Sequence, residues 1–175
     1  MISEHPEWIP DFIELNDSGG DWNQYLEAIY NRFCEDLVYR KVRYRSTSVG
    51  VRRIPETDGK GYGFWHCISE GHQEEKRTPD LERCKRVGWI RAIIEHAGSV
   101  EIDCWQNWRG RERCHLLWYR EQYLVVIAER KAKTPGEKYY LLKTAYCTAG
   151  KKRIECLRRE RDAYKKTDAA PKDDV

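Results

Sequence analysis

The residue type best suited to acid–base chemistry near neutral pH stands in the segment from Phe64 to Glu70. This segment reads FWHCISE and holds His66 among aromatic and small side chains, next to basic segments. Because imidazole titrates near neutral pH, a histidine in such a setting can donate or accept a proton during catalysis. A lone histidine is more often structural, so the motif identifies a candidate rather than a site.

A second candidate is KTAY, residues 143 to 146, at the end of the last apolar segment. In a strand, alternation places Thr144 and Tyr146 on one face and Lys143 on the other. Two hydroxyls that point the same way can hydrogen-bond a phosphate. Ordinary strand composition with a half-buried tyrosine is the competing explanation.

Charge is distributed unevenly along the chain. Residues 1–36 contain nine acidic residues and one basic residue, Arg32, for a net charge of −8; since the total is +3, the other 139 residues carry +11. Residues 38–55 hold six basic side chains and no acid, interleaved with Tyr39 and Tyr44. Phosphate contacts combined with base stacking would suit this pattern, and a solvated edge explains it equally well.

Cysteine usage and hydropathy indicate a reduced compartment. The seven cysteines include no CxxC pair, which favours free thiols over a disulfide framework or a zinc site. We expect no metal and no other cofactor. The acidic start lacks the features of a signal peptide, and YLVVIA is far shorter than the roughly 20 apolar residues of a membrane span. A cytoplasmic protein without a membrane partner is expected.

Hydrophobic periodicity predicts a single α+β domain over residues 1–167. After a leading segment (1–20), helical spacing marks a helix at 21–38, and the aromatic run at 61–71 is typical of a strand. From 99 to 147 the period becomes two, which predicts a four-stranded antiparallel β-meander. The N-terminal helices would pack on this sheet, a basic helix would follow Gly150, and residues 168–175 would form a disordered tail.

The order of helix, aromatic-flanked histidine, short basic helix, meander and terminal TAY resembles a ribonuclease superfamily. Its members include barnase, EndoU, colicin-type tRNases and RelE, and many act as toxins that cleave RNA without a metal. The resemblance covers roughly residues 60–160, through FWHCISEG, RCKR, YLVVIAER and YYLLKTAY. It implies a bacterial or phage toxin-like endoribonuclease that acts on RNA, such as tRNA or ribosome-bound mRNA, and an antitoxin or immunity protein that covers the cleft.

Carried onto this sequence, the resemblance implies that His66 is the general acid or base and that Thr144 and Tyr146 contact the phosphate. The superfamily also places a cation at that phosphate, and the arginines that qualify by type are Arg83, Arg86, Arg91, Arg111 and Arg113. Among the strand positions we favour Arg113, because alternation puts Arg111 and His115 on the same strand face. A second acid or base would come from Tyr146, Glu70 or His115. The expected substrate contacts are Glu70, Arg83, Arg86, Arg111, Lys143 and His115.

The implied reaction is attack by the RNA 2′-hydroxyl on the adjacent phosphorus. This gives a 2′,3′-cyclic phosphate and a 5′-hydroxyl, requires neither a protein nucleophile nor a metal, and leaves DNA intact.

Three other functions are compatible with the residues. A nucleic-acid-binding or partner-binding module without catalysis would use the same basic stripes. Arg91 and His96 match the spacing of HEPN ribonucleases, although that family is helical and the alternating pattern after residue 99 disagrees with it. Glu95, Glu101 and Asp103 could hold magnesium, a spacing expected by chance among 29 acidic residues.

Overall fold

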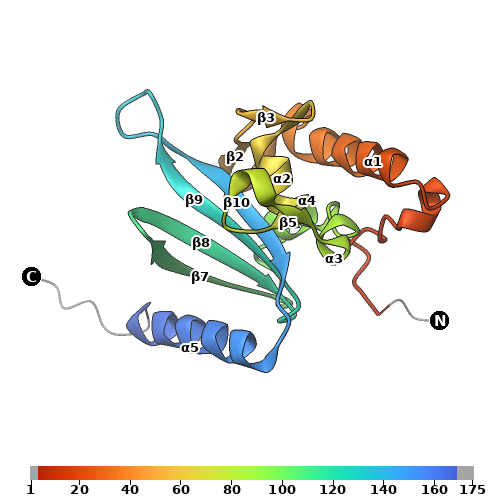
Figure 1. Cartoon of the computed structure of the whole chain (residues 1–175). Coiled ribbons are helices and arrows are strands. Elements are labelled where there is room, and N and C mark those ends of the chain that lie inside the picture. The colour runs from red at the N-terminus through yellow and green to blue at the C-terminus, as the bar shows by residue number, and fades with distance from the viewer. Residues whose placement is uncertain (1–3, 169–175) are drawn as a thin grey trace, which may run out of the picture.

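The protein combines helices with a mixed β-sheet of six strands and two short two-stranded ribbons, β3–β4 and β5–β6 (Figure 1). The computed structural model describes residues 4–168. The helices are η1 (Leu15–Ser18), α1 (Trp22–Cys34), η2 (Glu35–Tyr39), α2 (Tyr62–Ile68), η3 (Glu74–Lys76), α3 (Leu81–Cys84), α4 (Trp89–Glu95) and α5 (Lys151–Asp168). The strands are β1 (Val42–Tyr44), β2 (Thr47–Val51), β3 (Glu56–Thr57), β4 (Lys60–Gly61), β5 (Ser69–Glu70), β6 (Thr78–Pro79), β7 (Ile102–Arg109), β8 (Glu112–Tyr119), β9 (Tyr123–Lys131) and β10 (Lys138–Cys147). The predicted α+β class is confirmed.

The sheet is larger than the four strands that the sequence predicted. Its order is β1-β2-β10-β9-β8-β7, and β7 to β10 are antiparallel neighbours. The extra strands come from the basic segment 38–55, where β1 and β2 form a hairpin. Strand β2 then pairs with β10 in parallel over Tyr140 to Leu142. A parallel pair joins segments far apart in the chain, so local periodicity gives no signal for it.

Each face of the sheet is covered by helical structure. Along β8, Leu117 and Tyr119 face the main core with α1, α2 and α4, whereas Leu116 and Trp118 face the opposite side. There α5 packs on the sheet (Figure 1). Leu157 of α5 is completely buried in this second core. Two-sided burial explains why β9 carries the continuous apolar run YLVVIA rather than an alternating one.

The segment predicted as a strand at 61–71 is mainly the helix α2. Phe64, Cys67 and Ile68 lie at helical spacing and are almost completely buried, so they form the apolar stripe of a short helix. Trp65 and His66 remain partly exposed on its other side. The aromatic richness that favoured a strand therefore serves helix packing, and only Ser69–Glu70 is extended.

The structure describes most of the predicted N-terminal region, but only the first residue of the predicted C-terminal tail. The helix expected at 21–38 corresponds to α1, whose N-cap Asp21 accepts a hydrogen bond from the Gln24 amide, continued by the π-helical turn η2. In the leading segment, Trp8 stacks on His96 with ring centroids 4.5 Å apart. Of the predicted tail, Asp168 is the last residue of α5, and 169–175 lie outside the described residues.

Candidate functional site

A polar cleft of about 720 Å³ lies where the β5–β6 ribbon and α3 meet the second half of β10. Strand β2 pairs with β10 only as far as Leu142, so within residues 4–168 the later part of β10 has no strand neighbour on that side. Helices α2 and α3 pack there instead. The residues that line the cleft are Glu70, Gly71, His72, Lys76, Arg77, Thr78, Arg83, Thr144 and Tyr146.

The two hydroxyl residues of KTAY both line this cleft, as alternation would place them. The β10 register shifts between Leu142 and Thr144, which marks a β-bulge before the pair. The Thr144 hydroxyl donates a hydrogen bond of 2.8 Å to the backbone carbonyl of His66. Thr144 therefore ties α2 to the cleft wall, and its proton is already committed.

Two arginines supply fixed positive charge at the cleft. Arg77 and Arg83 both donate to the carbonyl oxygen of Ser69, at 2.6 and 2.7 Å. Arg77 also donates to the Gly71 carbonyl at 2.9 Å, and Arg83 lies 3.8 Å from Glu70. These bonds hold the β5–β6 ribbon together. Within residues 4–168 Arg77 has no carboxylate partner, and the carboxylates near Arg83 lie at 3.6 and 3.8 Å, so both arginines leave positive charge on the wall.

Tyr146 stands between two guanidinium groups. The Cζ atoms of Arg83 and Arg153 lie 5.4 and 5.6 Å from its ring centroid, within cation–π range. Arg153 also donates to the Tyr146 hydroxyl oxygen. Since the hydroxyl accepts from Arg153, its own proton remains available for donation to a ligand in the cleft.

His66 does not itself line the cleft but lies beside it, joined to Thr144 through its backbone carbonyl, and its ring is held in a defined orientation. Its Nε2 lies 2.8 and 3.0 Å from the two carboxylate oxygens of Glu74, and its ring stacks on Tyr62 with centroids 4.1 Å apart. A carboxylate only accepts, so the neutral imidazole is assigned its proton on Nε2. Nδ1, which has no hydrogen-bond partner among the described residues, is then the proton acceptor.

Burial lowers the pKa of His66 below its ordinary value, and the positive charge of Arg77 acts in the same direction. The Glu74 carboxylate opposes both effects, and the more distant charge of Lys143 adds to them. The neutral, basic form of His66 is therefore favoured at neutral pH. A group of this kind is suited to accept a proton rather than to donate one.

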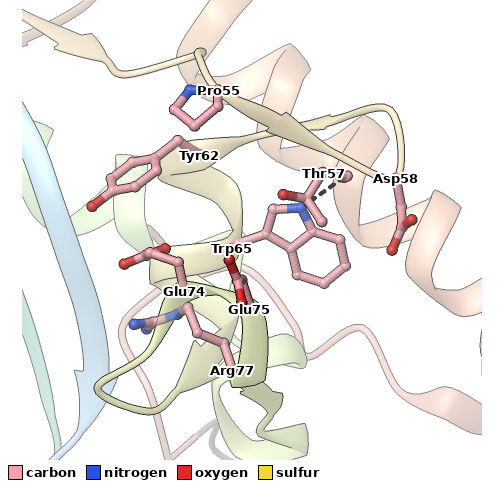
Figure 2. Close-up of a pocket in the computed structure, with 8 residues that line it drawn as sticks. All are labelled: Pro55, Thr57, Asp58, Tyr62, Trp65, Glu74, Glu75 and Arg77. Atoms are coloured by element: carbon pink, nitrogen blue, oxygen red, sulfur yellow. Dashed lines mark hydrogen bonds between the residues drawn. The ribbon is translucent and has the colours of Figure 1, made fainter.

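A second hollow of about 530 Å³ adjoins the cleft, and Figure 2 shows its walls. Arg77 lines both hollows, and Glu74, the partner of His66, lines this one. The Trp65 indole N–H donates 3.0 Å to the Thr57 carbonyl, which orients its ring. The remaining lining residues are Pro55, Asp58, Tyr62 and Glu75.

Several predicted site residues lie elsewhere. Arg111 lies in the turn between β7 and β8, and Arg113 lies near the start of β8. Because β9 separates β8 from β10, the structure does not bring Arg113 to the cleft. His115 is buried, with Nε2 2.8 Å from Glu129 and Nδ1 3.2 Å from the Tyr44 hydroxyl. Alternation along the strand put His115 on one face with Arg111 and Arg113, but the structure buries His115 beside Glu129, so this face is not a continuous charged surface.

Lys143 and Arg86 are engaged in ion pairs at the edge of the site. Lys143 lies 3.0 Å from Glu112, and Arg86 lies 2.6 Å from Glu82 on the same helical turn. Neither side chain lines the cleft. Their predicted role as substrate contacts therefore lacks a geometric basis in the cleft itself.

The residues that sequence reasoning missed lie in the loop between β5 and β6. The segment GHQEEKR, residues 71–77, looks like an ordinary solvated loop in the sequence, and it contains His72, Glu74, Lys76 and Arg77. Ser69 pairs with Pro79 and closes this loop into a ribbon over the cleft. The available signal was a histidine in a charged loop directly after FWHCISE, which alone does not predict closure.

The residues of the HEPN hypothesis and of the magnesium-site hypothesis are engaged in hydrogen bonds and ion pairs within the fold. Arg91 donates to the Asp36 and Lys41 carbonyls and to Glu95, while His96 bonds the Ala92 carbonyl. Glu101 and Asp103 likewise face cations. Within residues 4–168, no group of three or more His, Cys, Asp or Glu side chains is placed to hold a metal ion.

Fold and site together define an α+β protein with a polar, cationic cleft at the edge of a mixed sheet. Comparisons of this chain with models of protein families, with curated proteins and with solved structures found no match. In the described part of the chain, no helix has the length and apolar character to cross a membrane.

Proposed function

We propose that the protein is a metal-independent endoribonuclease whose active site is the cleft between the β5–β6 ribbon and β10. One observation carries the proposal: an oriented His66–Glu74 pair lies next to a cleft that is lined by a second histidine, a tyrosine and two fixed arginines. The resemblance of FWHCISEG and KTAY to the barnase, EndoU, colicin-type tRNase and RelE superfamily supports the same reaction.

In this proposal His66 is the general base. Its Nδ1 takes the proton of the RNA 2′-hydroxyl, and the oxygen attacks the adjacent phosphorus. Glu74 keeps the imidazole in the required tautomer and stabilises the imidazolium that forms. The charges of Arg77 and Arg83 stabilise the negative charge that develops on the phosphoryl oxygens.

His72 and Tyr146 are the proposed donors for the leaving group. Both line the cleft, and Tyr146 has a hydroxyl proton available. Proton donation to the 5′-oxygen completes the cleavage and leaves a 2′,3′-cyclic phosphate and a 5′-hydroxyl. RNA, in the form of tRNA or ribosome-bound mRNA, would be the substrate, and an antitoxin or immunity protein would occupy the cleft.

The decisive experiment is incubation of the purified protein with total RNA and tRNA in EDTA, followed by analysis of the fragment ends. We expect cleavage with cyclic phosphate ends, and no cleavage of a DNA of the same sequence. Cleavage that EDTA abolishes, or ends carrying a 5′-phosphate, would contradict the proposed mechanism.

A nucleic-acid-binding module without catalysis is the second candidate, favoured by one specific observation. In the basic segment 38–55, Tyr39 is 76% exposed, and the basic side chains of Lys41, Arg43 and Arg45 are exposed as well, as suits phosphate contacts and base stacking. This candidate predicts tight, salt-sensitive RNA binding with all RNA left intact. The EDTA assay separates the two, because only the ribonuclease produces new ends.

A further inference from the structure

Trp108 is unusually exposed for a tryptophan in a β-sheet. It lies near the end of β7 and is 63% exposed, and its cross-strand partner is Arg113. The turn after it and the β9–β10 turn lie at the same end of the sheet, at the left of Figure 1. Arg111, in the β7–β8 turn region, and Lys131, at the end of β9, are also exposed. We call Trp108, Arg111, Arg113 and Lys131 the hairpin-tip surface.

The cations of the hairpin-tip surface are free, unlike most of those around them. Within residues 4–168, Arg111, Arg113 and Lys131 make no side-chain hydrogen bond or ion pair. Three of their basic neighbours are paired, Arg109 with Glu160, Arg130 with Glu112, and Lys138 with Glu129, whereas Lys133 in the β9–β10 loop is exposed and adds to the free charge. The nearby acids are thereby neutralised, except for Glu137 in the β9–β10 loop. The hairpin-tip surface therefore carries an excess of positive charge that is open to a ligand.

The exposed indole stands between two hollows. One, of about 570 Å³, lies against α5, and the other, of about 640 Å³, lies against the β9–β10 loop. Trp108 and Arg113 line both. The first hollow also contains Gln106, whose Oε1 is buried without a hydrogen-bond partner in the described structure. An aromatic ring flanked by hollows can receive a planar group on its face.

We propose that the hairpin-tip surface binds a single-stranded stretch of nucleic acid, with an unpaired base stacked on Trp108 and phosphates on Arg111, Arg113 and Lys131. Base stacking on an aromatic ring beside free cations is the usual basis of single-strand binding, since every base has a π-face. A duplex keeps its bases stacked internally and offers none to the indole. An acidic protein segment would meet the charges but has no need of the ring.

This surface is distinct from the cleft, because none of its four residues lines the cleft. That the bound strand is RNA rests on the proposed function. In that case the hairpin-tip surface would bind a part of the substrate that lies outside the cleaved segment. The binding itself requires no catalysis. It can therefore be measured with a strand that the ribonuclease cannot cut.

The test is the anisotropy of a fluorescein-labelled 2′-O-methyl RNA 12-mer, which has no free 2′-hydroxyl and stays intact. Trp108→Ala should weaken binding at least about fivefold, equivalent to roughly 1 kcal/mol, whereas Trp108→Phe should retain most of the affinity. The double variant R111Q/R113Q should reduce the slope of log K against log salt concentration by about 1.4, from roughly 0.7 per phosphate contact. All the substituted side chains are exposed, so thermal unfolding should match the parent protein.

The matched control is R159Q/K166Q, which removes the same charge from the exposed side of α5. Equal weakening by this control and by R111Q/R113Q would overturn the proposal, as would unchanged binding in W108A. Equal affinity of a duplex of the same length, or of a polyglutamate peptide, would overturn it too. If the hairpin-tip variants weaken binding while RNA is never cleaved, the proposed function fails and this inference stands.

Discussion

The cleft and the hairpin-tip surface are both cationic, but their charges are held in different ways. In the cleft, Arg77 and Arg83 donate to the Ser69 carbonyl, and Tyr146 is flanked by guanidinium groups. At the hairpin-tip surface, Arg111 and Arg113 make no such contacts within the described residues. Charges held by the backbone are suited to chemistry, where position decides the rate. Free charges are suited to binding, where they release counterions and adapt to a flexible strand.

The largest expected effect tests whether the cleft carries out chemistry. His66→Gln should reduce kcat for RNA cleavage by about 10² to 10⁴, the usual contribution of a general base. Glutamine still offers an N–H to Glu74, so the fold should persist. The binding of the uncleavable 12-mer should change less than about twofold. A variant with parental kcat would remove His66 from the mechanism.

The next effect tests whether the cleft arginines are structural as well as electrostatic. Arg77→Ala removes charged hydrogen bonds to Ser69 and Gly71, so the free energy of unfolding should fall by about 2 kcal/mol. Urea denaturation measures this. Arg111→Ala is the matched control and should change the free energy of unfolding by less than about 0.5 kcal/mol, as expected for a free surface side chain. An equal loss of unfolding free energy in the two variants would contradict the distinction between structurally engaged arginines in the cleft and free arginines at the hairpin-tip surface.

A smaller effect lies in the pH dependence of cleavage. Because the pKa of His66 is lowered, its basic form persists as pH falls below the usual histidine range near about 6.5, and kcat/KM should decline only at lower pH. Glu74 raises the pKa of His66, so Glu74→Gln should move this acidic limb to still lower pH. A limb that stays in place, or moves to higher pH, would contradict the pairing of the two residues.

The smallest expected effect concerns the hairpin-tip surface during turnover. R111Q/R113Q should raise KM for a long RNA severalfold and leave kcat unchanged, because the surface touches substrate away from the reacting phosphate. A dinucleotide substrate, too short to reach it, is the control and should show no change in either constant. A fall in kcat for the dinucleotide would show that Arg113 takes part in the reaction, which would contradict its assignment to the hairpin-tip surface.

The α+β class and part of the site could be predicted from local patterns. Strand alternation placed Thr144 and Tyr146 together, and both line the cleft. Alternation also suggested a charged face through Arg113, where the structure instead buries His115 with Glu129. Alternation tells which residues share a face. It does not tell which end of the strand meets another element, so it gave no sign that Arg113 lies away from the cleft.

What the sequence determined by itself was set by short-range physics: the helix at 21–38, the continuous apolar strand β9, and the presence of His66 beside basic segments. The tertiary structure alone decided that β2 pairs with β10, that the aromatic run forms α2, and that the loop carrying His72 and Arg77 closes over the cleft. The reason is that such pairings depend on backbone hydrogen bonds between distant segments, and those groups are identical in every residue except proline. Side-chain patterns therefore specify each element, whereas the meeting of elements emerges only when the whole core is packed.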